Sequence, residues 1–288
     1  MSEFSVSWLA LREPADAVAR SSELVDLVGT PRVINDLGCG SGSMGRWLSA
    51  RLPGPLHWRL YDRDPALLRY AAAHLPNRSR DGSPVTAETR EADVAQLTAA
   101  DLGSSGSSGS SGKSGSSGKS GSSGKSGSSG SSGGSLVTAS ALLDLLTADE
   151  VSALAGACVE ARCPALFTLS VAGRVSFSPA DPLDDAIGEA FNAHQRRTVA
   201  GRRLLGPDAI DATSEAFARF GAETVVRPSL WRLAKPGDAA LIAAWLEGWV
   251  GAAAEQDPSL PVGDYLQRRL EADDLSVVVE HGDLFAVL

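Results

Sequence analysis

The sequence predicts an α/β protein whose core is a doubly wound, mostly parallel sheet with helices on both faces. Strand-like and helix-like segments alternate from residue 32 to residue 171, and a glycine-rich loop directly follows the first strand. The last apolar segment follows a connection too short for a parallel crossover, so the C-terminal strand should be antiparallel. The chain has 288 residues, 43% of them hydrophobic, which is enough to bury one such core.

The individual elements follow from the apolar runs and from the turn residues between them. Pro65, for example, suits the first turn of a helix. We expect strands at residues 32–37, 57–61, 86–92, 136–140 and 165–171, and helices at residues 15–28, 43–52, 65–75 and 148–161. Ligands of such sheets bind at the carboxyl ends of the strands, so the functional site is expected there.

The C-terminal part has a different pattern. A strand is expected at residues 224–233, a helix at 239–256 and a short helix at 265–272. The final segment, LSVVVEHGDLFAVL, has two apolar stretches around Gly282 and Asp283. It is interpreted either as one bulged strand or as a hairpin that turns at these two residues.

Residues 104–135 contain only serine, glycine and lysine, 18, 11 and 3 of them respectively. Such a segment has no apolar side chains to bury, so it is predicted to be disordered. We interpret it as an inserted or replaced surface loop, with a tether or phosphorylation segment as the alternative. Residues 1–288 are therefore predicted to form a single domain that this segment interrupts.

The composition excludes several classes of protein. The net charge is −9, and three of the four lysines lie in the serine and glycine segment, so the remainder is more acidic still. An acidic body argues against a nucleic-acid partner. We find no apolar run long enough for a membrane span, no secretory signal, and three cysteines too scattered for a zinc site. A cytoplasmic protein without a metal site is expected.

The segment INDLGCGSGSMGRW, residues 34–47, fits two kinds of ligand. Gly40, Gly42 and Gly45 satisfy the G-x-G-x-x-G pattern of a dinucleotide fold, whose helix N-terminus holds a pyrophosphate. Asp36, however, ends the first strand directly beneath that position, and its carboxylate would repel a phosphate. The same carboxylate suits an ammonium group, such as the α-amino group of S-adenosylmethionine (SAM). An NAD-dependent oxidoreductase remains the alternative.

Two further acidic residues follow strand ends in the expected order. Asp62 ends the second strand, where a carboxylate can accept both ribose hydroxyls, and Asp93 with Val94 follows the third, where an aspartate can accept from the adenine amino group. This series resembles the class I SAM-dependent methyltransferases. Their glycine-rich motif matches Asp36, Gly38, Gly40 and Gly42, and their later acidic residues match Asp62 and Asp93.

The resemblance covers residues 32–171 and implies a Rossmann-like, seven-stranded sheet with an antiparallel C-terminal strand. It also implies SAM as cofactor and a small molecule as methyl acceptor. In this family the end of the fourth strand, here Ser140 and Asp144, faces the acceptor. The Asn-Pro-Pro-Tyr motif of methylases that modify amide or adenine nitrogens is absent, so oxygen is the expected acceptor atom.

Other residues are candidates for the acceptor side of the site. Residues 172–222 are interpreted as an insertion that covers the substrate, and within them His194 is either a general base or part of a solvated helix face. An N-terminal helix should cross the mouth of the SAM site. There, Arg12 or Arg20 meets the methionine carboxylate or forms a surface ion pair. A SAM-binding protein without catalysis is the third hypothesis.

Overall fold

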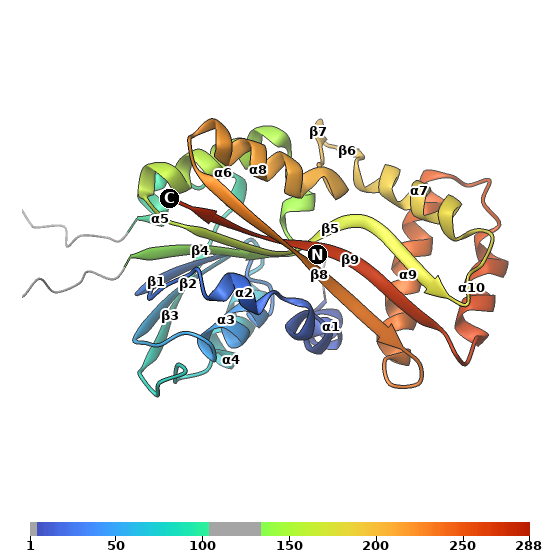
Figure 1. Cartoon of the computed structure of the whole chain (residues 1–288), viewed down its shortest axis with the longest axis horizontal. Coiled ribbons are helices and arrows are strands. Elements are labelled where there is room, and N and C mark those ends of the chain that lie inside the picture. Colours follow the sequence, from blue (N-terminus) through green and yellow to red (C-terminus); the bar gives the residue numbers. More distant parts are fainter. Residues whose placement is uncertain (1–4, 104–133) are drawn as a thin grey trace, which may run out of the picture.

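A seven-stranded sheet runs through the protein, as the computed structural model of the chain shows (Figure 1). The structure describes residues 5–103 and 134–288. The strand order is β3-β2-β1-β4-β5-β9-β8, and β9 is the strand antiparallel to both of its neighbours. The strands are β1 (Val33–Leu37), β2 (Leu56–Asp62), β3 (Val85–Glu91), β4 (Ser135–Ser140), β5 (Ala165–Ser178), β8 (Glu223–Ala234) and β9 (Ser276–Val287). The predicted sheet is thereby confirmed.

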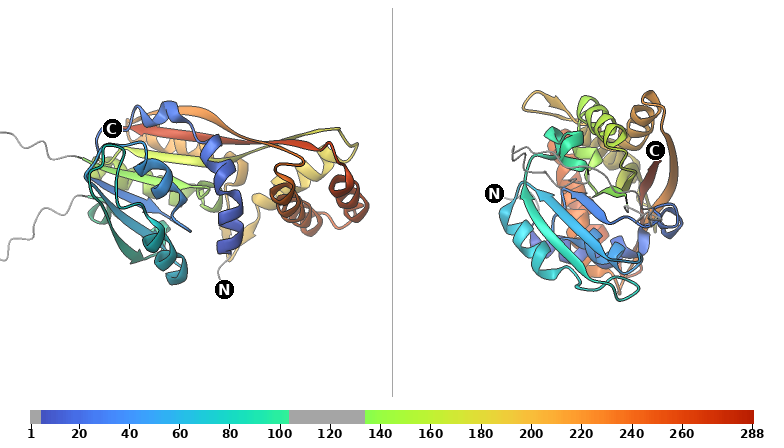
Figure 2. Two further views of the ribbon diagram at one scale, coloured as in Figure 1. Left: turned by 90° about the horizontal axis from the view of Figure 1, so that it is seen from below. Right: turned by 90° about the vertical axis from the view of Figure 1, so that its left-hand side faces the viewer.

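Helices cover both faces of this sheet (Figures 1 and 2). One face packs against α6 and α8 around Phe167 and Phe217, and the other packs against α3 and α4 around Trp58. The main helices are α1 (Val6–Ala19), α2 (Ser22–Val25), α3 (Ser43–Ser49), α4 (Pro65–His74), α5 (Ala99–Leu102), α6 (Ala148–Ala161), α7 (Asp184–Gln195), α8 (Ala209–Arg219), α9 (Ala239–Gln256) and α10 (Val262–Glu271). No helix in the described ranges is long and apolar enough to cross a membrane.

A third core lies where β5, β8 and β9 extend beyond the other strands, at the right of Figure 1. There α7, α9 and α10 pack around the buried side chains of Trp249, Tyr265 and Leu246. Residues 172–222, the expected insertion, comprise the end of β5, helix α7, a small hairpin (β6, Thr198–Val199, and β7, Arg202–Arg203) and α8. In the described part of the chain, the main sheet therefore has one layer of helices on each face. A third group of helices packs against the extended ends of β5, β8 and β9.

Two sequence-based boundaries and one alternative for the last segment were wrong, each because of a distant partner. The helix expected at 15–28 ends at Ala19, because the Ser21 N–H is donated to Asp283 Oδ2 at 2.7 Å and not to a helical carbonyl. The strand expected to end at residue 171 continues to Ser178, because β9 pairs with it as far as Ser276. The hairpin alternative at Gly282 and Asp283 is also wrong, since β9 is one continuous strand with irregular pairing to β5.

The chain segments just before residue 104 and just after residue 133 both contact the side chain of Asn35. Asn35 Nδ2 donates to Leu102 O at 3.0 Å and to Leu136 O at 3.4 Å. The predicted disorder of the serine and glycine segment concerns residues that lie outside the described ranges, apart from Gly134 and Ser135. Ser135 is the first residue of β4 and pairs with Val33, so the segment boundary predicted from composition was too long at this end.

Deletion of residues 104–133, with Gly103 joined to Gly134, is expected to leave the protein folded. Because both ends contact Asn35, Tm should change by less than about 3 °C, which corresponds to under 1 kcal/mol in a domain of this size. Deletion of residues 104–135 is the matched comparison, since it also removes the Gly134 carbonyl that accepts the Arg32 N–H at 2.9 Å. Calorimetry should show a lower Tm for the longer deletion. Equal and large decreases in Tm for both deletions would contradict the boundary between residues 133 and 134.

Candidate active site

A cavity of about 670 Å³ opens at the carboxyl ends of β1, β2 and β4, within the size range of ordinary ligand pockets. Its wall is formed by α1, by the glycine-rich loop between β1 and α3, by the end of β2 and by the turn after β4. Several residues predicted from the sequence line this cavity: Arg12, Asp36, Gly38, Gly40, Asp62, Val94 and Ser140.

Asp36 lies at the floor of this cavity and is 1% exposed. Its Oδ1 accepts a hydrogen bond from Thr138 Oγ1 at 2.8 Å, while Oδ2 is buried and has no partner among the described residues. Burial raises the pKa of Asp36 to about 7, and the Thr138 hydroxyl and the Arg20 guanidinium oppose that rise. A buried carboxylate oxygen without a donor indicates a ligand that supplies one.

The glycines of the loop after β1 adopt conformations that other residues avoid. Gly38, Gly40 and Gly42 have φ values of 60°, 53° and 82°. A Cβ on Gly38 would approach Leu142 Cδ1 at 3.1 Å, and one on Gly42 would approach the Cβ of Ala71 in α4 at 3.0 Å. Gly42 therefore also allows α3 and α4 to pack closely, which the sequence motif did not indicate.

A pair of glycine variants separates the two roles of Gly42. Gly82 has φ 80°, but a Cβ added there would meet nothing within 4 Å, so Gly82→Ala should cost only the left-handed backbone strain, about 1–2 kcal/mol. Gly42→Ala has the same strain plus the contact with Ala71, and it should lose about 1–3 kcal/mol more. Urea unfolding of both variants measures the difference. Equal losses would show that close packing is not required at Gly42.

Asp62 organises the loop as well as lining the cavity. Its Oδ2 accepts the Gly40 N–H at 2.9 Å, and its Oδ1 accepts the Asp64 N–H at 3.0 Å. Each carboxylate oxygen has two lone pairs, so both oxygens can still accept from a ribose hydroxyl. The same side chain can therefore hold the loop and a ligand.

Asp93 and Val94 follow β3, as expected, but they face different surroundings. Val94 lines the cavity and packs against the core that contains Leu143. Asp93 is the N-cap of a short 3₁₀ turn (Val94–Gln96), where its Oδ1 accepts the Ala95 N–H at 3.1 Å. Unlike Val94, Asp93 is not among the described residues that form the cavity wall.

The carboxylates of Asp62 and Asp93 should differ in their effect on cofactor affinity. Asp62→Ala is expected to weaken SAM binding about tenfold, the value of a hydrogen bond to a charged acceptor. Asp93→Ala should change the affinity less than about twofold, because its carboxylate caps a turn outside the cavity wall. Calorimetric titration of both variants with SAM provides the comparison. A larger loss for Asp93→Ala would restore the adenine contact that the family resemblance implies.

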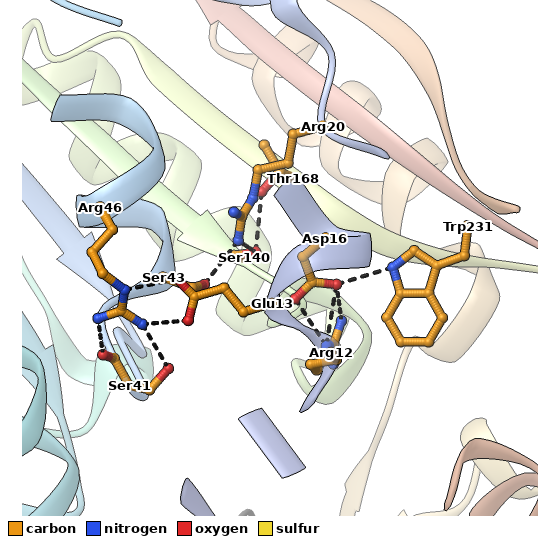
Figure 3. A network of polar contacts seen from close by, with 10 residues as sticks. All are labelled: Arg12, Glu13, Asp16, Arg20, Ser41, Ser43, Arg46, Ser140, Thr168 and Trp231. Atoms are coloured by element: carbon orange, nitrogen blue, oxygen red, sulfur yellow. Dashed lines mark hydrogen bonds and ion pairs between the residues drawn. The ribbon is translucent and has the colours of Figure 1, made fainter. Parts of the chain in front are cut away.

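Ser140 joins the cavity to a buried arginine (Figure 3). Arg20, 4% exposed, donates from Nη2 to Ser140 Oγ at 3.0 Å and to Ser43 Oγ at 2.9 Å. Its Nε and Nη1 are buried without a partner among the described residues, and burial lowers its pKa. Thr168 Oγ1 donates to Ser140 Oγ at 3.1 Å. Arg20 thus lies behind the two serines that line the cavity.

Helix α1 crosses the cavity, as expected, and is held there by polar contacts (Figure 3). Glu13 accepts from Arg46 Nε of α3 at 2.7 Å, and Arg46 Nη1 donates to Ser41 O of the glycine-rich loop at 2.7 Å. Asp16 accepts from Arg12 and from Trp231 Nε1 of β8, the latter at 3.0 Å. Asp16 was not predicted as a site residue. Its spacing of four residues from both Arg12 and Arg20 could have indicated an ion pair on one face of a helix.

The two predicted catalytic residues lie in different places. Asp144 is in a short 3₁₀ turn (Leu143–Leu145) whose neighbours Leu142 and Leu145 line the cavity, and it is 6% exposed. Burial raises the pKa of Asp144 to about 6, and its Oδ1 has no partner in the described chain. His194, in contrast, contacts Glu255 Oε2 of α9 at 3.1 Å and is not part of the cavity wall.

The chemistry of the wall fits SAM. The unpartnered oxygen of Asp36 matches an ammonium group, the buried Arg20 with Ser43 and Ser140 matches a carboxylate, and Asp62 matches a ribose. No group of histidine, cysteine, aspartate and glutamate side chains in the described ranges could hold a metal ion.

The strand order and the antiparallel β9 define the fold of the class I SAM-dependent methyltransferases. Among solved structures, the chain is similar to a cyclopropane-fatty-acyl-phospholipid synthase-like protein from Lactobacillus casei, with a TM-score of 0.51, 12% identity, and coverage of 99% of this chain and 94% of that one. It is also similar to a cyclopropane synthase from Mycobacterium tuberculosis, with a TM-score of 0.48, 11% identity, and coverage of 99% and 95%.

Comparison of sequences gives a narrower match. A stretch of 66 residues is 41% identical to part of the biotin biosynthesis bifunctional protein BioCD of Bordetella avium. The match covers 23% of this chain and 14% of that protein, so the chain spans a small share of this relative's length. No family model matches the chain. At 12% identity, the similarity to the Lactobacillus casei structure establishes the fold alone.

Proposed function

We propose that the protein is a SAM-dependent methyltransferase that acts on a small-molecule acceptor at an oxygen atom. The observation that carries this proposal is the buried, unpartnered Oδ2 of Asp36 at the floor of the cavity. A dinucleotide would place its pyrophosphate against this carboxylate, whereas SAM offers an ammonium group. This difference favours a methyltransferase over an NAD-dependent oxidoreductase.

In this proposal the residues of the wall bind and orient the cofactor. Asp36 receives the ammonium group, Asp62 receives the ribose hydroxyls, and Gly38, Gly40 and Gly42 allow the loop backbone to approach. Val94 supplies apolar surface beside the adenine, with Asp93 at the edge of that region. Ser140 and Ser43, backed by Arg20, receive the methionine carboxylate. The bound SAM supplies a methyl group on a sulfonium, a carbon open to in-line displacement.

The remaining task of the chain is to position the acceptor and accept its proton. As the oxygen–methyl bond forms and the sulfur–methyl bond breaks, the sulfur keeps the bonding electrons and the acceptor hydroxyl must lose its proton. We assign the proton to Asp144, whose buried carboxylate is ionised in about half of the molecules at pH 6. No step is assigned to His194, since its ring pairs with Glu255 of α9, whereas Asp144 lies between Leu142 and Leu145, which line the cavity.

Two experiments test the proposal. Calorimetric titration with SAM, S-adenosylhomocysteine and NAD distinguishes the two cofactor classes, and we expect binding of the first two and none of NAD. Transfer of a labelled methyl group from SAM to the small-molecule fraction of a cell extract then tests catalysis. Binding of SAM without transfer to any fraction would favour the third hypothesis, a non-catalytic SAM-binding protein. Binding of NAD alone would overturn the proposal.

A further inference from the structure

Arg12 of α1 forms part of the cavity wall, and one edge of its guanidinium group is fixed by Asp16. Nε donates to Asp16 Oδ2 at 2.9 Å, and Nη2 donates to Asp16 Oδ1 at 3.1 Å (Figure 3). Asp16 is itself held by Trp231 Nε1. The Arg12 side chain is 13% exposed, and it forms part of the cavity wall. Its orientation is therefore set by the protein before any ligand binds.

The other edge of the same guanidinium group is available. A guanidinium group has five N–H donors in a planar fork, and Asp16 occupies only the Nε and Nη2 edge. Nη1 has no hydrogen-bond partner among the described residues, and it is not buried. A planar edge of two N–H donors matches a carboxylate in bidentate geometry.

The surroundings of this edge are apolar and aromatic. The guanidinium carbon lies 5.0 Å from the ring centre of Trp231 and 5.9 Å from that of Trp8. Leu9, Leu142 and Leu145 also line the cavity. A cation in an apolar wall strengthens its interaction with an anion, because less water screens the two charges.

Arg12 of α1 and Arg20, which follows the end of that helix, have different surroundings. Arg20 contacts Ser43 and Ser140 and acts electrostatically on Asp36, where the methionine part of SAM is proposed to bind. Arg12 instead lies near the turn that carries Asp144: burial raises the pKa of Asp144, and Arg12 opposes that rise. The cofactor carboxylate already has a receptor in Arg20 and the two serines, so Arg12 is left for a second anion.

We propose that Arg12 binds a carboxylate of the methyl acceptor, so that the substrates of this protein are small carboxylic acids with an apolar or aromatic body. The inference rests on the proposed function, which supplies the second ligand of the cavity. Arg12 is thereby a specificity-determining residue, whereas Asp16 and Trp231 position it.

The test uses benzoate and benzamide, two probes of nearly equal shape that differ in charge. The full-length protein is saturated with S-adenosylhomocysteine and titrated with each probe, with calorimetry and with the fluorescence of the tryptophans beside Arg12 as readouts. Benzoate should bind, and Arg12→Gln should weaken it about tenfold or more. Arg12→Lys should fall between the two, since it keeps the charge without the planar fork. Benzamide should bind parent and variants alike.

Matched variants protect this result from a folding defect. Arg12→Gln together with Asp16→Asn removes the ion pair without leaving a buried unpaired charge, and it should lose benzoate as the single variant does. Arg227→Gln, at an exposed ion pair with Glu23, should leave all affinities unchanged. S-adenosylhomocysteine should bind the Arg12 variants within about twofold of the parent, as expected where no hydrogen bond is lost.

Two outcomes would overturn the inference. Benzoate affinity that is unchanged in the double variant would show that Arg12 receives no carboxylate. Loss of S-adenosylhomocysteine affinity in that variant would assign Arg12 to the cofactor instead. The titration is repeated without S-adenosylhomocysteine, so that the two proposals can be separated. Arg12-dependent benzoate binding to a protein that binds no SAM would retain the anion site and reject the methyltransferase function.

Discussion

Asp36→Asn is expected to weaken SAM binding about 10- to 100-fold at pH 7.5, because a hydrogen bond to a charged group contributes about 1.5–3 kcal/mol. The substitution keeps the shape of the side chain and an oxygen that can accept from Thr138 Oγ1. It removes the negative charge that the ammonium group requires. Calorimetric titration of the two proteins with SAM measures the change.

The pH dependence of SAM affinity gives an independent readout of the same residue. Burial raises the pKa of Asp36 to about 7 in the free protein, so the carboxyl is largely protonated at pH 6. An ammonium ligand favours the ionised form, so the parent should bind SAM more weakly as the pH falls from 7.5 to 6 and should release a proton on binding. The Asp36→Asn variant should show neither effect.

Thr138→Val is the matched control for this pH dependence. It removes the hydroxyl that opposes the raised pKa of Asp36, so the midpoint of the affinity change should move to higher pH. A parent protein that binds no SAM, together with tighter NAD binding by Asp36→Asn, would reject the methyltransferase and support the oxidoreductase. In that case the carboxylate repels a pyrophosphate and its removal helps.

Asp144→Asn is expected to lower kcat by about 10²- to 10⁴-fold, the usual contribution of a positioned general base. Burial raises the pKa of Asp144 to about 6, so the parent rate should fall as the pH drops through 6 and the base becomes protonated. The residual rate of the variant should lack this fall. SAM affinity should stay the same, since the cavity wall is formed by Leu142 and Leu145 and not by Asp144.

The raised pKa of Asp144 also predicts how Asp144→Asn changes the stability of the fold at different pH values. The folded pKa of Asp144 lies above its unfolded value, so the protonated group stabilises the fold at low pH, and this contribution is lost as the pH rises through about 6. Removal of the charge should therefore not lower Tm at pH 8. His194→Gln is the matched comparison and should leave kcat unchanged, because His194 pairs with Glu255. The opposite ranking of the two variants would assign the proton to His194.

The positions of the strands along the chain could be predicted from the sequence because most of them are marked by a local apolar run. The ends of those runs placed Asp36, Asp62 and Ser140 at one edge of the sheet, and the cavity contains all three. The positive φ values of Gly38, Gly40 and Gly42 likewise follow from a local preference of glycine, although the close packing at Gly42 does not. This part of the site was therefore determined by residue types and by short spacings along the chain.

Contacts between distant residues decided the rest. Helix α1 ends at Ala19 because Asp283, 262 residues later, accepts the Ser21 N–H. His194 was a candidate base in the sequence, but α7 packs against α9 in the structure, and the His194 ring contacts Glu255 there. A local sequence pattern cannot specify a hydrogen-bond partner that comes close only when distant parts of the chain fold together.

The different surroundings of Arg12 and Arg20 also could not be predicted from local sequence patterns. The sequence by itself determined that an N-terminal helical segment brings Arg12 and Arg20 to the mouth of the cavity, because its helical pattern and its place before the first strand are local properties. Only the tertiary structure decided that Arg20 is buried behind Ser43 and Ser140 while Arg12 lines the cavity. The physical reason is that Asp16 and Trp231 fix the Arg12 guanidinium group, and Trp231 reaches that position only through the pairing of β8 with β9.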